Sequence, residues 1–270
     1  MELCLQSKTG RRSTYAYTGG KAFDAQAPCV VFIHGALHDH SVWTLLARWF
    51  AHHGHAVLAP DLPAHGRSAG PPLNDVQALA DWTLNLLDAA GVAQARLVGH
   101  SMGSLIALEA AARAPKRVKQ LVMIGTAYPM KVSQALLDTA RDAPLKAIDM
   151  VNAFSHSSIA NKPSFPGPGM WLHGSNQVLM RRTQAGQPGL NLFHHDFGVC
   201  DRYANGLQAA AKVECPVTLI LGERDQMTPA KSTSEIATAL KARIVNVPAG
   251  HSMMAEAPDA VLAALRQAIQ

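Results

Sequence analysis

The chain has 270 residues, of which 48% are apolar and 16% charged, and its formal net charge is +5. This balance is that of a globular protein and excludes a disordered chain, and the length suits one large domain with or without an insertion. Lys and Arg are scattered and form no basic stripe interleaved with aromatic residues, so nucleic acid is not expected as a partner.

The N-terminal residues lack the basic stretch and apolar run of a signal peptide. No segment approaches the ~18 consecutive apolar residues of a membrane span. We therefore expect a cytoplasmic protein that makes no membrane contact. Four cysteines show no C-x-x-C spacing and are expected to be free thiols: Cys4, Cys29, Cys200 and Cys215.

The predicted elements alternate along the chain. Residues 3–6 and 13–18, joined through Lys8-Thr9-Gly10, are expected to form an opening hairpin. Apolar runs then predict six strands, over 29–34, 55–62, 96–101, 118–127, 217–223 and 242–249. Helical spacing of apolar residues lies between them, over 42–50, 75–90, 105–113 and 230–240, and again from Pro258 onward. This order predicts an α/β fold with a mostly parallel sheet and helices on both faces.

One long segment interrupts the alternation. Residues 129–212 are far longer than an ordinary connection between neighbouring elements, and they carry helical patterns of their own, with Pro144 placed to start the second. A Pro/Gly-rich piece follows at 161–169. We therefore predict an inserted, mainly helical cap domain over 129–212 and a core domain built from 1–128 and 213–270.

The residues Gly99-His100-Ser101-Met102-Gly103 fit the pattern G-x-S-x-G between a predicted strand and a predicted helix. A sharp turn there lifts the serine hydroxyl above the sheet, and small flanking residues relieve the crowding. Five residues with three fixed positions recur by chance, so the strand–turn–helix setting matters more than the pattern. Ser101 is therefore the candidate nucleophile.

A serine needs a base, because its hydroxyl is a poor nucleophile at neutral pH. His251 follows the last predicted strand and Asp225 follows the strand before it. Catalytic groups of open α/β sheets gather at the carboxyl ends of the strands. The chain order Ser, Asp, His is the order expected of a nucleophile, its acid and its base on such a sheet.

A second donor for a developing oxyanion is expected from the loop after the strand 29–34. His34-Gly35-Ala36-Leu37 forms this loop. The backbone N–H groups of Ala36 and Met102 are the predicted pair of donors, and losing one such donor typically costs ~2.7–4 kcal/mol in the barrier.

Five segments together resemble the α/β-hydrolase superfamily, of the small capped kind. They are HGALHDHSVW (34–43), DLPAHGRS (61–68), GHSMGS (99–104), LILGERDQMTP (219–229) and AGHSMMAEAPD (249–259). The resemblance implies an eight-stranded, mostly parallel sheet, a pocket under the cap, no cofactor, and Ser101, Asp225 and His251 as a triad. Ser104 stands where the family often has glycine, a departure that leaves the triad untouched.

The expected activity is hydrolysis of a small-molecule carboxylic ester through an acyl-enzyme on Ser101, as in a carboxylesterase. Hydrolysis of a C–C bond in a diketone, of a lactone or of an amide, and perhydrolysis, use the same triad and stay open. Dehalogenase and epoxide hydrolase relatives use an aspartate nucleophile, so Ser101 disfavours them. A non-catalytic or slowly hydrolysing ligand receptor is the alternative from another class.

The remaining candidates concern the pocket and the thirteen histidines. Residues expected to line the substrate pocket are His34, Leu37, His38, His100 and Trp171. For His34 a bracing role in the oxyanion loop is preferred to catalysis, and for His100 a packed structural role is preferred to that of a base. No H-E-x-x-H motif is present, so we expect no metal site. The sequence leaves monomer and dimer open.

Overall fold

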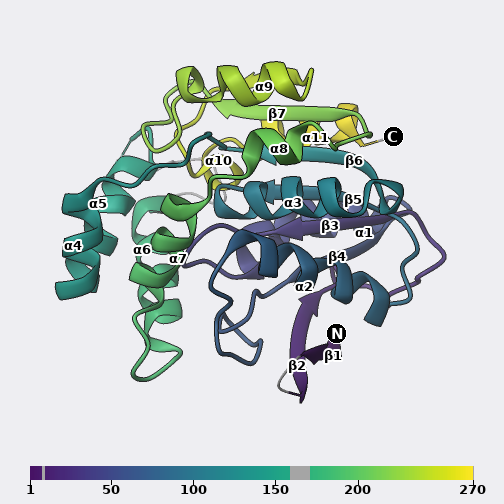
Figure 1. Cartoon of the computed structure of the whole chain (residues 1–270), viewed down its shortest axis with the longest axis horizontal. Helices are drawn as coiled ribbons and strands as arrows, with labels where there is room; N and C mark the ends of the chain where they lie inside the picture. Colours follow the sequence, from purple (N-terminus) through teal and green to yellow (C-terminus); the bar gives the residue numbers. More distant parts are fainter. Residues whose placement is uncertain (8–9, 159–170, 270) are drawn as a thin grey trace.

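The computed structural model describes residues 1–7, 10–158 and 171–269 and has an eight-stranded sheet at its centre. The strand order is β1-β2-β4-β3-β5-β6-β7-β8 (Figure 1). The strands are β1 (Glu2–Ser7), β2 (Gly10–Tyr17), β3 (Cys29–Ile33), β4 (Ala56–Pro60), β5 (Ala95–His100), β6 (Val118–Ile124), β7 (Val217–Gly222) and β8 (Arg243–Val247). β1 and β2 form the predicted antiparallel hairpin, whose Lys8-Thr9 lies outside the described residues, and β3 to β8 are parallel.

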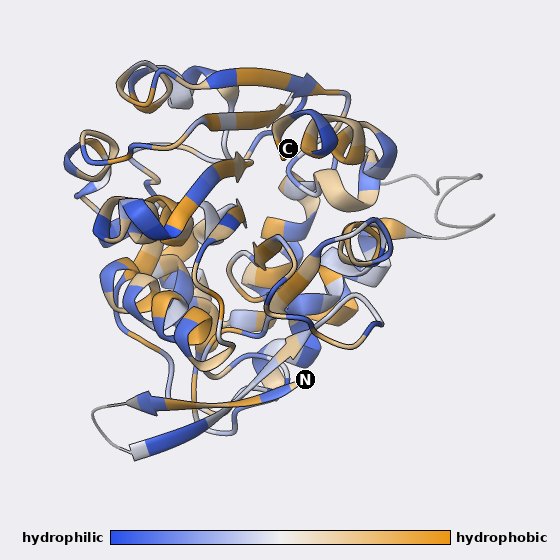
Figure 2. Ribbon diagram, turned by 90° about the vertical axis from the view of Figure 1, so that its right-hand side faces the viewer, coloured by the Kyte–Doolittle hydropathy of each residue, from blue (hydrophilic) through white to orange (hydrophobic). Residues whose placement is uncertain are grey.

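Helices cover both faces of the sheet, as the continuous apolar runs predict. Alternate residues of β3 enter two different cores: Val31 and Ile33 pack with α2 and α3, while Val30 and Phe32 pack with α1 and α11. Figure 2 shows hydrophobic colour concentrated on the central strands. The helices on the sheet are α1 (Thr44–His52), α2 (Val76–Ala89), α3 (Met102–Arg113), α8 (Gly206–Ala210), α9 (Ser234–Ala239) and α11 (Pro258–Ala268).

Four helices between β6 and β7 lie over the carboxyl ends of the strands, at the left of Figure 1. They are α4 (Gln134–Asp142), α5 (Pro144–Ser155), α6 (Leu172–Ala185) and α7 (Leu192–Arg202), and we call them the inserted helices. Pro144 starts α5 as predicted. Their core includes Ile148 and Phe193 and also Leu37 from the loop after β3, so they pack directly on the sheet's edge. The Pro/Gly-rich piece 161–169 lies outside the described residues.

Several boundaries differ from the predicted ones. β6 ends at Ile124, three residues earlier than predicted, because Gly125 turns the chain with φ +55°. α3 starts at Met102 rather than Leu105, directly after the Ser101 turn. The short 3-10 helix η1 (His40–Trp43) precedes α1. The helix α10 (Met253–Glu256) has only one turn, which is too short for a periodic apolar pattern to predict it.

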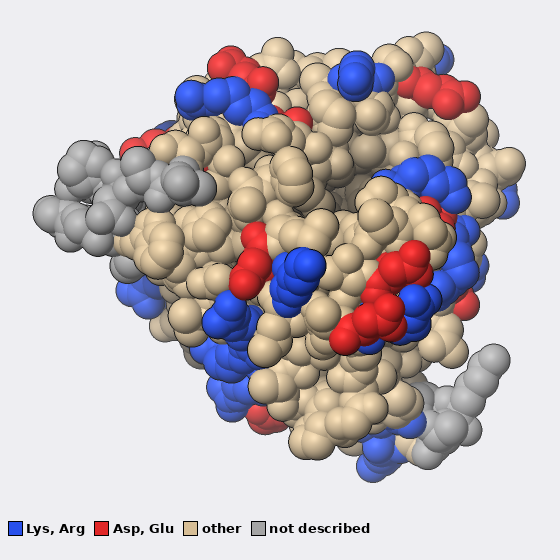
Figure 3. Space-filling view, turned by 90° about the vertical axis from the view of Figure 1, so that its left-hand side faces the viewer, with Lys and Arg blue, Asp and Glu red and all other residues tan. Residues whose placement is uncertain are grey.

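The surface on the side of the inserted helices carries charges of both signs, interspersed with broad uncharged areas (Figure 3). Among the described helices, none combines the length and the apolar character that spanning a membrane requires.

Candidate active site

Ser101 lies in a strained turn at the carboxyl end of β5. Its backbone dihedral angles are φ 53° and ψ −121°, a conformation that residues other than glycine rarely adopt. The backbone N–H of Ser101 donates to the carbonyl of Ile124 on β6 at 2.9 Å, which fixes the turn to the sheet. Strain of this kind costs about 1–3 kcal/mol and persists only where the surroundings hold it.

The glycines around Ser101 are required by close backbone packing. A Cβ on Gly99 would overlap the backbone of Gly103, and a Cβ on Gly103 would overlap the carbonyl of Ile33. Ser104, the departure from the family pattern, donates its hydroxyl to the carbonyl of Ser101 at 2.6 Å. The extra hydroxyl therefore braces the carbonyl side of the turn.

Asp225 and His251 meet at the ends of β7 and β8. The Nδ1–H of His251 donates to Oδ2 of Asp225 at 2.9 Å, which leaves Nε2 as the proton acceptor. Asp225 also accepts from the N–H of Met227 at 2.8 Å and from the hydroxyl of Thr228 at 2.7 Å. Burial by itself raises the pKa of Asp225, but the charge and hydrogen bond of His251 and the bonds from Thr228 outweigh it and hold the pKa well below its usual range.

Three of the predicted catalytic groups, Ser101, His251 and Ala36, line one cavity of about 60 Å³. Thr228 lines it as well. Met102 is the first residue of α3, so its N–H has no acceptor within the helix. The structure therefore brings the five predicted groups to one edge of the sheet.

A hydrogen bond to the inserted helices fixes the loop that carries Ala36. Leu37 has φ 56°, and its N–H donates to Oδ2 of Asp196 on α7 at 2.9 Å. The same oxygen accepts from Nε2 of His65 at 2.8 Å, and both side chains are buried. Burial by itself lowers the pKa of His65, but the Asp196 carboxylate outweighs it and raises that pKa. The buried pair thus fixes the backbone next to Ala36.

Two of the five predicted pocket residues lie at the cavity that Ser101 lines. His38 and His100 line the cavity that holds Ser101. His100 is also packed as predicted, since it is 1% exposed and its Nε2–H donates to the carbonyl of His251 at 3.0 Å.

The other three pocket predictions need correction, because none of these residues is among the described residues that line this cavity. His34 turns away to the backbone: its Nδ1–H donates to the Gly35 carbonyl and its Nε2 accepts from the Leu62 N–H. Leu37 is wholly buried in the core of the inserted helices. Trp171 stacks on His173 with 5.4 Å between ring centroids and is 48% exposed.

His34 provides a testable pH dependence of stability. Burial lowers its pKa to about 4, so in acid the unfolded chain binds a proton that the folded chain does not. This contribution to stability is complete above pH ~6.5 and is lost as pH falls towards 4, with a slope of at most about 1.4 kcal/mol per pH unit. His34→Gln, which keeps a donor and an acceptor, should lessen the wild-type slope by that amount in urea unfolding between pH 4.5 and 6.5.

The matched control for this measurement is His52→Gln, which removes a solvent-exposed imidazole at the end of α1. That variant should unfold with the wild-type slope. An unchanged slope in His34→Gln would show that burial of this ring does not set the acid sensitivity.

Asp39, His40 and Asp61 bring one possible metal ligand each within 4.8 Å of one another. Their oxygens are already engaged. Oδ1 of Asp61 accepts from the N–H and Nδ1 of His40 at 2.8 and 2.7 Å, and Oδ2 of Asp39 accepts from Arg182 at 2.6 Å. Since these donors point at the carboxylates, we assign the cluster to holding the loops after β3 and β4.

The family follows from a match over most of the chain. The model of the alpha/beta hydrolase fold family matches residues 28–258, which include every residue placed above at the edge of the sheet. The chain belongs to this family.

Individual relatives agree with that assignment. The chain is 29% identical over 259 residues to the pimeloyl-[acyl-carrier protein] methyl ester esterase of Chromobacterium violaceum, covering 90% of this chain and 87% of that protein. It is 28% identical over 212 residues to the dihydrolipoyllysine-residue acetyltransferase component of the acetoin cleaving system of Pseudomonas putida, covering 76% of this chain and only 54% of that longer protein. The enol-lactonase from Burkholderia xenovorans LB400 shares the fold with a TM-score of 0.81 at 21% identity, with 95% of this chain and 96% of that chain covered.

Proposed function

We propose that this protein is a serine hydrolase that cleaves small-molecule carboxylic esters, with Ser101, His251 and Asp225 as its catalytic triad. The observation that carries the proposal is the 2.9 Å bond between His251 and Asp225 at the cavity that Ser101 also lines. The bond leaves Nε2 of His251 as a base, and a hydroxyl at a strained turn is the group such a base activates.

The proposed cycle has two halves. The Oγ of Ser101 attacks the ester carbonyl while Nε2 of His251 takes its proton, and the N–H groups of Ala36 and Met102 stabilise the oxyanion. His251 then gives this proton to the leaving oxygen as the C–O bond breaks, which releases the alcohol and leaves an acyl-enzyme. Water attacks the acyl group by the same route, with His251 again as base and then as acid, and releases the carboxylic acid. The inserted helices act as a cap that excludes water and limits substrate size.

Asp225 stays ionised throughout this cycle. Its pKa is held well below the usual value of an aspartate, so it is a carboxylate near neutral pH. It holds the imidazole tautomer and stabilises the imidazolium that forms when His251 accepts the proton. These three side chains and two backbone donors supply every group that ester hydrolysis needs.

Labelling with a fluorophosphonate tests the proposal. Such a reagent phosphonylates only an activated serine, so peptide mapping of the folded protein should find the adduct on Ser101 and none after heat denaturation. A folded protein that leaves Ser101 unlabelled would instead favour a ligand receptor. Rates for p-nitrophenyl esters, a lactone and an amide then report which bond is cleaved fastest.

A further inference from the structure

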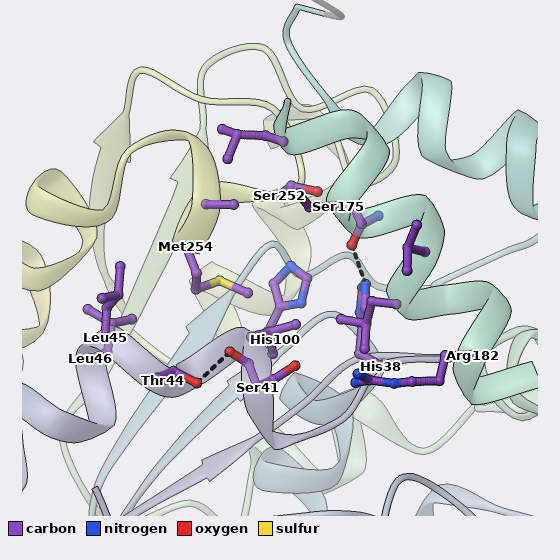
Figure 4. Close-up of a pocket in the computed structure, with 16 residues that line it drawn as sticks. His38, Ser41, Thr44, Leu45, Leu46, His100, Ser175, Arg182, Ser252 and Met254 are labelled. Atoms are coloured by element: carbon purple, nitrogen blue, oxygen red, sulfur yellow. Dashed lines mark hydrogen bonds between the residues drawn. The ribbon is translucent and has the colours of Figure 1, made fainter. Parts of the chain in front are cut away.

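A second cavity, of about 350 Å³, lies beside the one that holds Ser101. It is bounded by η1 and α1 on the sheet side, by α6 among the inserted helices and by α10 after His251 (Figure 4). The set of residues that line it includes His38 and His100, Leu45 on α1, Val178 and Arg182 on α6, and Met254 on α10. Neither the triad nor its oxyanion donors are in this set.

The two cavities are adjacent and share two lining residues, His38 and His100. The smaller cavity has a volume of about 60 Å³ and the larger one about 350 Å³. Only the larger volume falls in the ~300–1,000 Å³ range of small-molecule sites. An ester that the smaller cavity cannot hold needs further space, and the second cavity, on the other side of these two imidazoles, is of suitable size.

The second cavity favours an uncharged occupant. Of the described residues lining it, only Arg182 carries a permanent charge, and its guanidinium already donates to Asp39 at 2.6 Å. Burial lowers the pKa of His38 to about 4 and that of His100 well below its usual value, so both imidazoles are neutral near pH 7. The Nε2–H of His38 donates to Oδ1 of Asn176 on α6 at 2.9 Å, which anchors that ring at the boundary between the cavities (Figure 4).

The cavity also displays apolar groups to solvent. Leu45 on α1 is 51% exposed and Val178 on α6 is 64% exposed, and both line it. Met254 from α10 also lines the cavity (Figure 4). Exposed apolar side chains around a cavity next to a candidate active site favour binding of an apolar group of a ligand.

We propose that the cavity between α1 and α6 binds the larger, uncharged and apolar part of the substrate, so that the enzyme prefers esters bearing a medium-length alkyl or a ring system over short acetates. This inference rests on the proposed esterase function. It adds the substrate class and names Leu45 and Val178 as residues that contact the substrate.

Two ester series test the preference. Ethyl esters of acids from acetate to decanoate vary the acyl half, and acetates of alcohols from ethanol to decanol vary the other half. Along the series whose variable half enters the cavity, kcat/KM should rise about fourfold for each methylene buried, until the cavity is full. A flat dependence in both series, with the acetates hydrolysed normally, would overturn the inference and leave the esterase proposal standing.

A pair of matched variants assigns the effect to the cavity. Leu45→Asp places a carboxylate in the lining, whereas Leu145→Asp changes a leucine of similar exposure, 53%, that lies outside both cavities among the described residues. Both leucines are second in their helices, so the added charge meets the same favourable dipole. Leu45→Asp should lower the ratio of kcat/KM for octyl or octanoyl esters to kcat/KM for ethyl acetate at least about tenfold, whereas Leu145→Asp should leave this ratio at its wild-type value.

A binding measurement separates this inference from the catalytic one. The uncharged fluorophore N-phenyl-1-naphthylamine should bind the wild-type protein and Leu145→Asp, and bind Leu45→Asp at least about tenfold more weakly, even if no ester is hydrolysed. Loss of hydrolysis with this binding pattern intact would contradict the esterase function alone. Equal binding to the two variants would contradict the cavity's role.

Discussion

Ser101→Ala is expected, under the proposed serine mechanism, to lower kcat/KM for ester substrates by on the order of 10⁴-fold or more, to the residual rate that oxyanion donors and binding alone provide. The reason is that the other groups at the cavity, His251 included, then have no nucleophile to activate. Steady-state kinetics with a p-nitrophenyl ester measures the effect. The fold should be retained, since alanine removes a hydroxyl and adds no bulk.

The control variants use the strain at the same position. Alanine at 101 keeps the unfavourable φ of 53°, whereas Ser101→Gly relieves it and should be more stable than Ser101→Ala by about 1 kcal/mol in urea unfolding, while equally inactive. Ser234→Ala, an exposed serine at the start of α9, should keep full activity. A Ser101→Ala protein that hydrolyses esters at the wild-type rate would remove Ser101 from the mechanism.

The sequence predicts the central fold well because its signals there are local. A strand buried on both faces needs apolar side chains at every position, so CVVFI of β3 stands out from its surroundings. Boundaries are less well predicted where a turn depends on one residue. Gly125 ends β6 by a left-handed conformation that an apolar pattern does not encode.

The candidate site divides in the same way. Ser101, Asp225 and His251 each follow a predicted strand, so their meeting at one edge follows from the topology of a parallel sheet. The bond between His65 and Asp196 joins residues 131 positions apart and depends on how α7 packs. Sequence reasoning missed this bond. A signal for it does exist, since Asp196 lies on the same helical face as the apolar residues of α7.

Thr228 is a second residue that the sequence reasoning missed. It follows Asp225 by three positions, a spacing at which an aspartate commonly accepts from the backbone of its own turn, as it does here at 2.9 Å. The failed prediction for Trp171 has the opposite cause. An aromatic residue in a predicted cap was expected to face the pocket, but its ring stacks on His173 at the surface instead.

Asp225→Asn is expected to lower kcat by about 10⁴-fold, with a much smaller change in KM. The Asn amide would present either N–H groups or a neutral oxygen to Nδ1 of His251. If N–H faces the ring, Nδ1 must accept and the imidazole proton moves to Nε2, where it can no longer take the proton of Ser101. In the proposed mechanism the carboxylate of Asp225 prevents this, and it also balances the charge of the imidazolium.

Thr228→Val separates the charge of Asp225 from its positioning. The Thr228 hydroxyl lies 2.7 Å from Oδ2 of Asp225 and 3.2 Å from Nδ1 of His251, but the backbone N–H groups of Met227 and Thr228 keep holding the carboxylate after it is removed. Thr228→Val should therefore cost only about ten- to a hundredfold in kcat. A loss as large as that of Asp225→Asn would mean that the hydroxyl, rather than the carboxylate charge, orients His251, whereas a small loss assigns that role to Asp225 itself.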